Sequence, residues 1–248
     1  MAEASPDVRL NGVDYAPHEI PVVFFGLKAP LAYVHNAKAA CTSALNFLFY
    51  ANHGYLYVDP QAIHASNFAF VRLGPDFPPE RVEAFNDRKP ETFSFVRDPL
   101  QRFISGFISK IFSHGDQNYR ELRDLVTSVH GVDLSAQANP ARSCLAFAKL
   151  IAAQTDVKQI DRHFRPQYLN LGYDGPFRVD TLLRLEDRDA VLAFVSRWIG
   201  REKAQWLLAQ KFGAAPEYSK DAFICDELID VVRQTYARDY ESFYSQAV

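Results

Sequence analysis

Cysteine is scarce in this chain, and no charge of one sign dominates it. The three cysteines are widely spaced and odd in number, which argues against a disulfide framework, and they form no metal-binding cluster along the sequence. The net charge of −3 gives no general attraction to nucleic acid or to an anionic membrane, so any basic site has to be local. We therefore expect no metal and no nucleic-acid partner.

Long apolar runs are missing as well. No stretch approaches the length of a transmembrane helix, and the polar, acidic residues 1–20 contain no apolar core of a signal peptide. The sequence therefore predicts a cytoplasmic protein without a membrane span. It carries no indication of an oligomeric state.

The composition that remains is that of an ordinary globular protein, with 48% hydrophobic and 23% charged residues in a chain of 248. A chain of this length can bury a large core. We expect a single domain over residues 1–248, in which residues 1–20 form a poorly ordered or loosely packed N-terminal segment.

Strand-like apolar runs alternate with helix-like segments through the first half of the chain. The expected strands are Pro21–Phe25, Leu31–His35, Phe68–Leu73, Thr92–Val96 and Thr181–Leu185. The expected helices are Thr42–His53, Pro79–Asn86, Pro99–Phe112, Tyr119–Val129, Pro140–Ala153, Asp187–Ile199 and Asp226–Phe243. This order favours an α/β fold with a parallel sheet flanked by helices, followed by a mostly helical second half. Because such sheets bind ligands at the carboxyl ends of their strands, the loops after His35 and Val96 are the candidate sites.

The first of these loops lies in the stretch HNAKAACTS, which contains no glycine. Lys38 offers a positive charge, and the following helix start offers backbone N–H groups. Ala39 and Ala40 leave room for a phosphate, although alanine is not expected to adopt the positive φ angles that glycine allows. Thr42 and Ser43 add hydroxyl donors. The segment is either a phosphate-binding loop or an ordinary strand–turn–helix with a solvated lysine.

The Walker pattern G-x-x-x-x-G-K-[ST] is absent from this loop. Lys38 is followed by Ala39, so no hydroxyl stands in the position that would bind magnesium. This absence disfavours a site for ATP with magnesium.

The second loop lies in the stretch TFSFVRDPLQRFISGF. Arg97 follows a buried strand, and Asp98-Pro99 is typical of a helix start. The helical period puts Arg102, Ser105 and Ser109 opposite the apolar face and outside the core. Two arginines and a serine suit a second phosphate, which they would bind by charge-assisted hydrogen bonds. The alternative is that Arg97 pairs with a carboxylate while Ser105 faces solvent.

Together the two stretches resemble the PAPS-dependent sulfotransferases, specifically the Golgi-type carbohydrate enzymes that modify chondroitin, dermatan and the HNK-1 glycan. YVHNAKAACTSALNF resembles their 5′-phosphosulfate loop, and FSFVRDPLQRFISGF resembles their 3′-phosphate motif. DRHFRPQ, FRVDTLLRLEDRD and TYARDYESFYS resemble later segments of the family, so the likeness spans about Leu31 to Ser245. The chain departs from the pattern at Ala37, Leu45 and Asn46, where the family often has a proline, a tryptophan and a basic residue.

The resemblance implies a P-loop-NTPase-like fold and a defined reaction. The enzyme would move a sulfuryl group from 3′-phosphoadenosine-5′-phosphosulfate (PAPS) to a hydroxyl of a small molecule or glycan, release 3′,5′-ADP (PAP) and need no metal. Lys38 would also stabilise the bridging oxygen as the S–O bond breaks. The cofactor contacts implied by the two motifs are Lys38, Ala39, Ala40, Cys41, Thr42, Ser43, Arg97, Arg102 and Ser105.

The acceptor hydroxyl needs a base, and histidine is the usual choice near neutral pH. The stretch QAIHASNF resembles the family's A-H-x-S segment, which implies that His64 is this base. The alternative for His64 is a loop histidine with a structural hydrogen bond. His35, His53 and His163 are further candidates.

Several later polar residues are assigned to the acceptor or cofactor cleft through the same resemblance: His163, Arg165, Gln167, Glu186, Ser219 and Lys220. Because Pro166 favours an extended conformation at the residue before it, the first three are expected to point to one side. They are equally compatible with a buried polar strut. Glu186 either orients a histidine or arginine or caps the following helix, and the last two either cover the cofactor or form a solvated turn.

Two other functions stay open at this point. One is a nucleotide or small-molecule kinase of the P-loop type, which would share the sheet and loop geometry. The other is a non-catalytic PAP-binding module that has this fold.

Overall fold

The computed structural model describes residues 8–10, 13–15, 21–65, 70–74, 79–112, 119–132, 139–210, 212 and 218–245. The chain divides into two compact units. Residues 1–96 and 167–213 form unit 1, and residues 97–166 and 214–248 form unit 2. Each unit has its own hydrophobic core and is described by itself, so the single domain expected over 1–248 stays a prediction.

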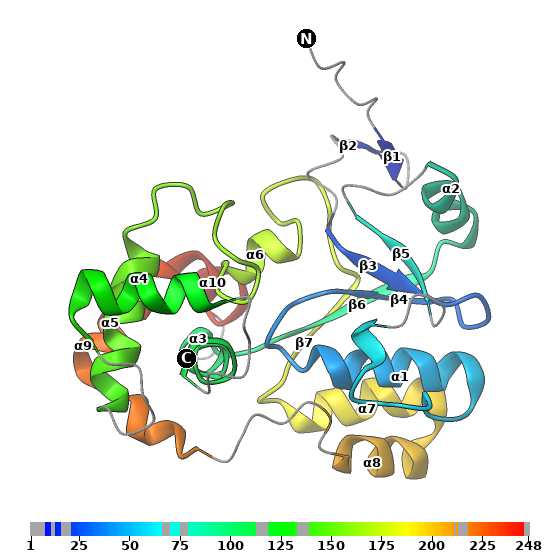
Figure 1. Cartoon of the computed structure of the whole chain (residues 1–248). Helices are drawn as coiled ribbons and strands as arrows, with labels where there is room; N and C mark the ends of the chain where they lie inside the picture. Colours follow the sequence, from blue (N-terminus) through cyan, green and yellow to red (C-terminus); the bar gives the residue numbers. More distant parts are fainter. Residues whose placement is uncertain are drawn as a thin grey trace. The chain divides into compact units, whose positions relative to one another are not determined.

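Unit 1 is built on a five-stranded sheet with the strand order β5-β3-β4-β6-β7 (Figure 1). The strands are β3 (Val23–Phe25), β4 (Leu31–Val34), β5 (Val71–Leu73), β6 (Glu91–Val96) and β7 (Thr181–Arg184). β4, β6 and β7 are parallel to one another, whereas β3 is antiparallel to both β4 and β5. The predicted α/β class is confirmed, but the prediction that the sheet is parallel is wrong for β3. The connection between β3 and β4, residues 26–30, is too short for the crossover that a parallel pair requires.

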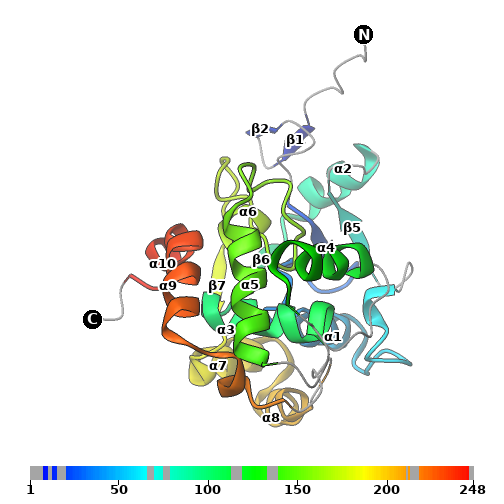
Figure 2. The ribbon, with the colours of Figure 1, turned by 60° about the vertical axis from the view of Figure 1, so that its left-hand side comes forward.

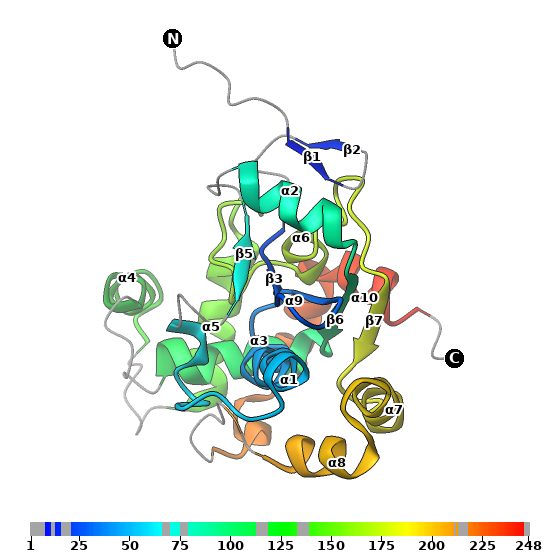
Figure 3. The ribbon, with the colours of Figure 1, turned by 90° about the vertical axis from the view of Figure 1, so that its right-hand side faces the viewer.

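Helices cover this sheet. α1 (Cys41–His53), α7 (Arg188–Ile199) and α8 (Arg201–Ala209) lie together on one side of it, whereas α2 (Pro79–Arg88) packs against β5 (Figures 1 and 3). The core between α1, α7 and the sheet contains Phe47, Phe93 and Phe194, whose ring centroids are 5.2 to 6.0 Å apart. α6 (Gln167–Asn170), the 3₁₀ helix η2 (Ile63–Ala65) and a hairpin of β1 (Val8–Leu10) and β2 (Val13–Tyr15) complete the described elements of unit 1.

Asn52 near the end of α1 anchors the β3–β4 turn. Its Oδ1 accepts hydrogen bonds from the backbone N–H groups of Lys28 (3.0 Å) and Ala29 (2.9 Å). Its Nδ2 donates to the carbonyl of Leu48 (2.8 Å). A Cβ at Gly26 would lie only 2.1 Å from Oδ1 of Asn52, so the close packing here requires a glycine. These contacts hold α1 against the strand pair from which the first candidate loop emerges.

Unit 2 is helical in its described part, and Figure 2 shows α5 with α9 and α4 on either side of it. Its elements are α3 (Pro99–Phe107), the π-helix η3 (Ile108–Phe112), α4 (Arg120–His130), α5 (Pro140–Ala152), the 3₁₀ helix η5 (Lys220–Phe223), α9 (Asp226–Thr235) and α10 (Ala237–Phe243). Phe103, Phe107 and Phe147 lie in its core together with Phe164 and Phe223. The prediction of a mostly helical second half is confirmed. None of the described helices in either unit is long and apolar enough to cross a membrane.

Candidate functional site

The loop between β4 and α1 has two non-glycine residues in the left-handed region of backbone space. Lys38 has φ 64° and Ala40 has φ 53°. The expectation that the alanines avoid positive φ is therefore wrong for Ala40. Such a conformation costs a non-glycine residue about 1–2 kcal/mol, so the surrounding structure has to hold it in place. Ala37 and Ala39 contribute to this because they are 1% and 0% exposed and pack inside unit 1.

Asn36 ties this loop to its surroundings and was missed by sequence reasoning. Its backbone N–H donates to the hydroxyl of Tyr33 (3.2 Å), and its Nδ2 donates to the carbonyl of Phe95 and to Oε1 of Gln167, both at 2.9 Å. Asn170 donates to its Oδ1 at 3.4 Å. A polar residue directly after a buried strand was the available signal. Asn36 and Gln167 are both fully buried, so these bonds are shielded from water and fix where the loop leaves the sheet.

The start of α1 is suited to an anion. Ala40 is its N-cap and provides no side-chain hydrogen bond, and the first turn contains no acidic residue. The first helical bond runs from the N–H of Ala44 to the carbonyl of Ala40 (2.9 Å), so the helix itself supplies no acceptor for the N–H groups of Cys41, Thr42 and Ser43. These groups and the positive end of the helix dipole favour a bound phosphate or sulfate.

His64 lies beside this helix start although it follows Lys38 by many residues. Its Nε2 is 3.0 Å from Oγ1 of Thr42, within hydrogen-bond distance, and its side chain is exposed. The segment before it is fastened to α1 by Asn46, whose Nδ2 donates to the carbonyls of Thr42 (2.9 Å) and Pro60 (2.8 Å). The structure therefore brings together the predicted loop and the predicted base. Residues 66–68, the last three of the QAIHASNF stretch, lie outside the described residues.

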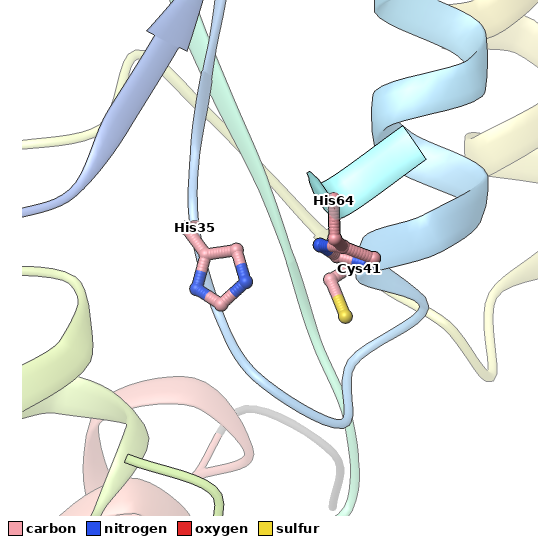
Figure 4. A group of neighbouring side chains, drawn as sticks. All are labelled: His35, Cys41 and His64. Atoms are coloured by element: carbon pink, nitrogen blue, oxygen red, sulfur yellow. The ribbon is translucent and has the colours of Figure 1, made fainter. Parts of the chain in front are cut away.

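His35 and Cys41 complete this group of side chains (Figure 4). His35 is 8% exposed, and its ring meets that of His64 edge-on with 6.0 Å between centroids. One ligand atom from each of His35, Cys41 and His64 lies within 4.8 Å of the others, a separation from which the three could bind a metal ion. His53 lies elsewhere, stacked on Phe49 near the end of α1 with 4.3 Å between ring centroids.

In unit 2, Arg97 and Lys220 are electrostatically coupled. Burial, followed by the nearby charge of Arg97, lowers the pKa of Lys220. The Nζ of Lys220 donates to Oε1 of Gln101 (3.4 Å), and Ser105 lies one helical turn after Gln101 on the same face of α3. Two neighbouring cations repel each other, so a bound anion would stabilise Arg97 and Lys220 beside the amide of Gln101. Gln101 was missed, although its spacing of four residues from Ser105 within the predicted helix was a usable signal.

Arg102 does not lie outside the core as predicted. It is 1% exposed, and its Nη2 donates to the carbonyl of Arg162 (3.0 Å) inside unit 2. Ser105 is also buried, at 9%, whereas Ser109 is partly exposed. The helical period correctly separates an apolar face of α3 from a polar one. Residues on the polar face are buried too, and the long side chain of Arg102 there reaches the carbonyl of Arg162. In this structure Arg102 fastens α3 to the segment before Phe164.

His163 forms a hydrogen-bonded cluster with Asp161 and Tyr119. Its Nδ1 is 2.7 Å from Oδ1 of Asp161 and 2.8 Å from the hydroxyl of Tyr119, which also donates to Asp161 (3.0 Å). Burial lowers the pKa of His163 and outweighs the opposing effect of Asp161. Burial alone would raise the pKa of Asp161, but its hydrogen bonds with His163 and Tyr119 hold it well below the ordinary value.

The extended segment predicted around Arg165 is a turn instead. The N–H groups of Phe164 and Arg165 both donate to the carbonyl of Asp161 (2.8 Å each), which closes the chain on itself before Pro166. Arg165 uses its Nε to donate to the carbonyl of Ile160 (3.0 Å), and Gln167 belongs to the Asn36 network of unit 1. The three side chains thus have separate surroundings and do not share one side of a strand.

Two further predicted positions lie at helix starts. Glu186 is exposed after β7, but Asp187 is the residue that caps α7, accepting from the N–H of Ala190 (3.0 Å). The capping role considered for Glu186 is therefore wrong. Ser219 is the N-cap position of η5, directly before Lys220, and is exposed.

The model of the sulfotransferase family matches residues 24–245, which include both units. The chain therefore belongs to the sulfotransferase family, and the protein is a transferase of sulfuryl groups. No curated protein and no solved structure gives a significant match to it.

Proposed function

We propose that the protein transfers the sulfuryl group of PAPS to a hydroxyl acceptor, with a carbohydrate or glycoconjugate as the acceptor class. The observation that supports His64 as the base is its hydrogen bond with Thr42, because Thr42 lies at the start of α1, where the phosphosulfate would bind in this proposal. The carbohydrate class rests on the motif resemblance alone. We also propose that the protein is cytoplasmic.

His64 acts as the general base in this proposal. It accepts the proton of the acceptor hydroxyl while the acceptor oxygen forms a bond to sulfur and the bond between sulfur and the bridging phosphate oxygen breaks. The electron pair of the broken bond stays on that oxygen, as part of the product PAP. A positioned base of this kind is worth about 10²–10⁴-fold in rate.

Lys38 and the first N–H groups of α1 hold the phosphosulfate and neutralise the charge that develops on the bridging oxygen. The support for this role is the open helix start, without a side-chain cap and without an acidic residue in its first turn. Such donors act mainly in the transition state, because that is where the negative charge grows, and removal of one typically costs about 10²–10³-fold in rate.

Arg97, Gln101, Ser105 and Lys220 of unit 2 are assigned to the 3′-phosphate. The electrostatic coupling of Lys220 to Arg97 supports this assignment, because a bound dianion would relieve the repulsion between them. The 3′-phosphate is also the group that distinguishes PAPS and PAP from ATP, so these residues are the proposed basis of cofactor selectivity.

Ligand binding tests the cofactor. PAP should raise the thermal unfolding midpoint of the wild-type protein, whereas ATP with magnesium should have a much smaller effect. Arg97→Ala should weaken PAP binding by about 10–100-fold, the loss expected for a charged hydrogen bond. Arg142→Ala, which removes an exposed arginine of α5 in the same unit, serves as the matched control. Stabilisation by ATP with magnesium but not by PAP would instead favour a kinase.

Turnover with labelled PAPS and a panel of hydroxyl acceptors tests the reaction itself. His64→Ala and Lys38→Ala should each remain folded by circular dichroism and lose at least about 10²-fold in kcat. His53→Ala and Lys28→Ala are matched controls, since both residues lie in unit 1 away from the loop. If the His64 variant keeps full turnover, His64 is not the base. PAP binding without turnover of any acceptor would favour a non-catalytic module.

A further inference from the structure

Three side chains that can bind a transition metal converge from separate segments of unit 1. His35 follows β4, Cys41 is the first residue of α1, and His64 lies in η2. Their ligand atoms lie within 4.8 Å of one another, and Figure 4 shows the three side chains grouped around the loop that joins β4 to α1. The sequence predicted no metal, because the three cysteines form no cluster along the chain and the reaction implied by the resemblance needs none.

The surrounding packing holds this group in place. The His35 ring is 8% exposed and lies against the rings of Phe24 and Tyr33, at 5.9 and 6.0 Å between centroids. Asn46 fastens the chain segment before His64 to α1 through the carbonyl of Pro60. Since these segments are already positioned, an ion would have to order little more than the side chains themselves.

The three donor atoms are two imidazole nitrogens and one sulfur. Zn²⁺ prefers such donors, in contrast to Mg²⁺ and Ca²⁺, which prefer oxygen ligands. Zn–N bonds of about 2.0–2.1 Å and Zn–S bonds of about 2.3 Å put the ligands of a tetrahedral ion about 3.3–3.6 Å apart. The ligand atoms now lie within 4.8 Å of one another, so binding requires each pair to approach by about 1.5 Å at most.

We propose that His35, Cys41 and His64 form a three-ligand Zn²⁺ site whose fourth position is open to water or another ligand. Cys41 binds as the thiolate, so the sulfur loses its proton to solvent as the Zn–S bond forms and no electrons are exchanged. The site forms when the start of α1 is not occupied by an anionic ligand.

The proposed site has a consequence for activity that rests on the proposed function. A Zn²⁺ ion on His64 uses the lone pair that would accept the proton of the acceptor hydroxyl. An ion on Cys41 also occupies the start of the helix that would hold the phosphosulfate. Zn²⁺ is therefore an inhibitor that a chelator reverses, and bound PAP opposes its binding.

Metal binding by the full-length chain is measured directly, after removal of metals and with a reductant that contains no thiol. Zn²⁺ titrated calorimetrically should bind with one equivalent at this site. Co²⁺ should give the intense visible bands of a tetrahedral ion and a near-ultraviolet band from sulfur-to-cobalt charge transfer, both of which Zn²⁺ removes. Absence of a stoichiometric site in the wild-type protein would overturn the proposal.

Variants identify the ligands. Cys41→Ser should abolish the charge-transfer band, and Cys41→Ser and His64→Ala should each weaken Zn²⁺ binding by at least about tenfold, since even outer-shell changes have effects of that size. His64 is exposed, so its truncation does not threaten the core. Cys225→Ser, which removes the other partly buried cysteine, should bind both ions like the wild type. Unchanged binding by the Cys41 variant, or loss of binding by the Cys225 variant, would overturn the assignment.

Inhibition is measured as the ratio of turnover with and without Zn²⁺ in each protein. The wild type and Cys225→Ser should lose turnover and regain it with EDTA, whereas Cys41→Ser should respond at least about tenfold more weakly. A protein that binds Zn²⁺ at these residues but turns over no acceptor contradicts the proposed function and leaves the metal site established. A protein that turns over normally but binds no Zn²⁺ contradicts the metal site alone.

Discussion

Two residues in the loop between β4 and α1 adopt backbone conformations that usually require glycine. Lys38 and Ala40 have positive φ, while Ala37 before them and Ala39 between them are buried. Such strain persists only where the surrounding structure holds the backbone in place. Here Asn36, at the start of the loop, is held by hydrogen bonds to Phe95 and Gln167. Two of the three described non-glycine residues with positive φ lie in this loop, and the third, Lys89 (φ 44°), follows α2.

Replacing Ala40 by glycine tests whether this strain is real. The variant should be as stable as the wild type or more stable by up to about 1 kcal/mol, because relief of the left-handed conformation exceeds the entropy that glycine adds to the unfolded chain. The free energy of unfolding in urea measures it.

Ala39→Gly is the matched control for this experiment. Ala39 has no positive φ and its methyl group is fully buried, so the same substitution should cost about 1–2 kcal/mol in chain entropy and lost burial. Equal losses in the two variants would show that Ala40 is not strained.

At the scale of elements, α3 shows how a short sequence signal determines a helix start. Asp98 accepts a hydrogen bond from the N–H of Gln101 (2.9 Å), and Pro99 occupies the first helical position. The same carboxylate is 3.5 Å from the hydroxyl of Tyr240 in α10. Burial, with the Asp98 charge as the next cause, raises the pKa of Tyr240 to about 12. Asp98 thus caps α3 and also raises the pKa of Tyr240 in α10.

Two substitutions separate these roles of Asp98. Asp98→Asn keeps a capping oxygen and should leave the unfolding free energy nearly unchanged, whereas Asp98→Ala should cost about 1 kcal/mol. Both remove the negative charge, so both should lower the pKa of Tyr240 from about 12, as measured by ultraviolet titration of tyrosine. A tyrosine titration identical in all three proteins would contradict the assigned cause.

At the scale of the whole molecule, the two units differ in their internal packing. Unit 1 surrounds a mixed sheet, and unit 2 packs helices around an aromatic core. Unit 2 also contains the Tyr119–Asp161–His163 cluster, which faces the charges of Lys110 and Arg162. Burial keeps the His163 imidazole neutral to lower pH than the ordinary value of 6.5, so the native state resists its protonation.

This resistance predicts how stability depends on pH. As the pH falls below about 6.5, His163 becomes protonated in the unfolded chain before it does in the native chain. Protonation therefore favours the unfolded state, and the free energy of unfolding decreases as the pH falls. His163→Gln should therefore have a flatter dependence of unfolding midpoint on pH between about 7 and 5. The same slope in variant and wild type would exclude His163 as a source of acid sensitivity.

The sequence by itself determined most elements and the local chemistry of the loops. Helix starts such as Asp98-Pro99 depend on hydrogen bonds within one turn, and apolar periodicity depends on neighbours a few residues away, so both can be recognised in a single chain. The match of the sulfotransferase family over residues 24–245 confirms the family that the two loop motifs indicated. α8 was missed, although its REKAQWLLA sequence has ordinary helix formers directly after Gly200.

Only the tertiary structure decided which distant residues meet. The burial of Arg102 and the positive φ of Ala40 depend on contacts between segments far apart in the chain. The same is true of His35, Cys41 and His64, which lie on a loop, a helix and a 3₁₀ turn. The direction of β3 and the turn at Asp161–Arg165 are more local, since a short connection joins β3 to β4 and hydrogen bonds to the Asp161 carbonyl close the turn. Sequence patterns report the period and the caps of single elements. The environment of a side chain depends on what the rest of the fold packs against it.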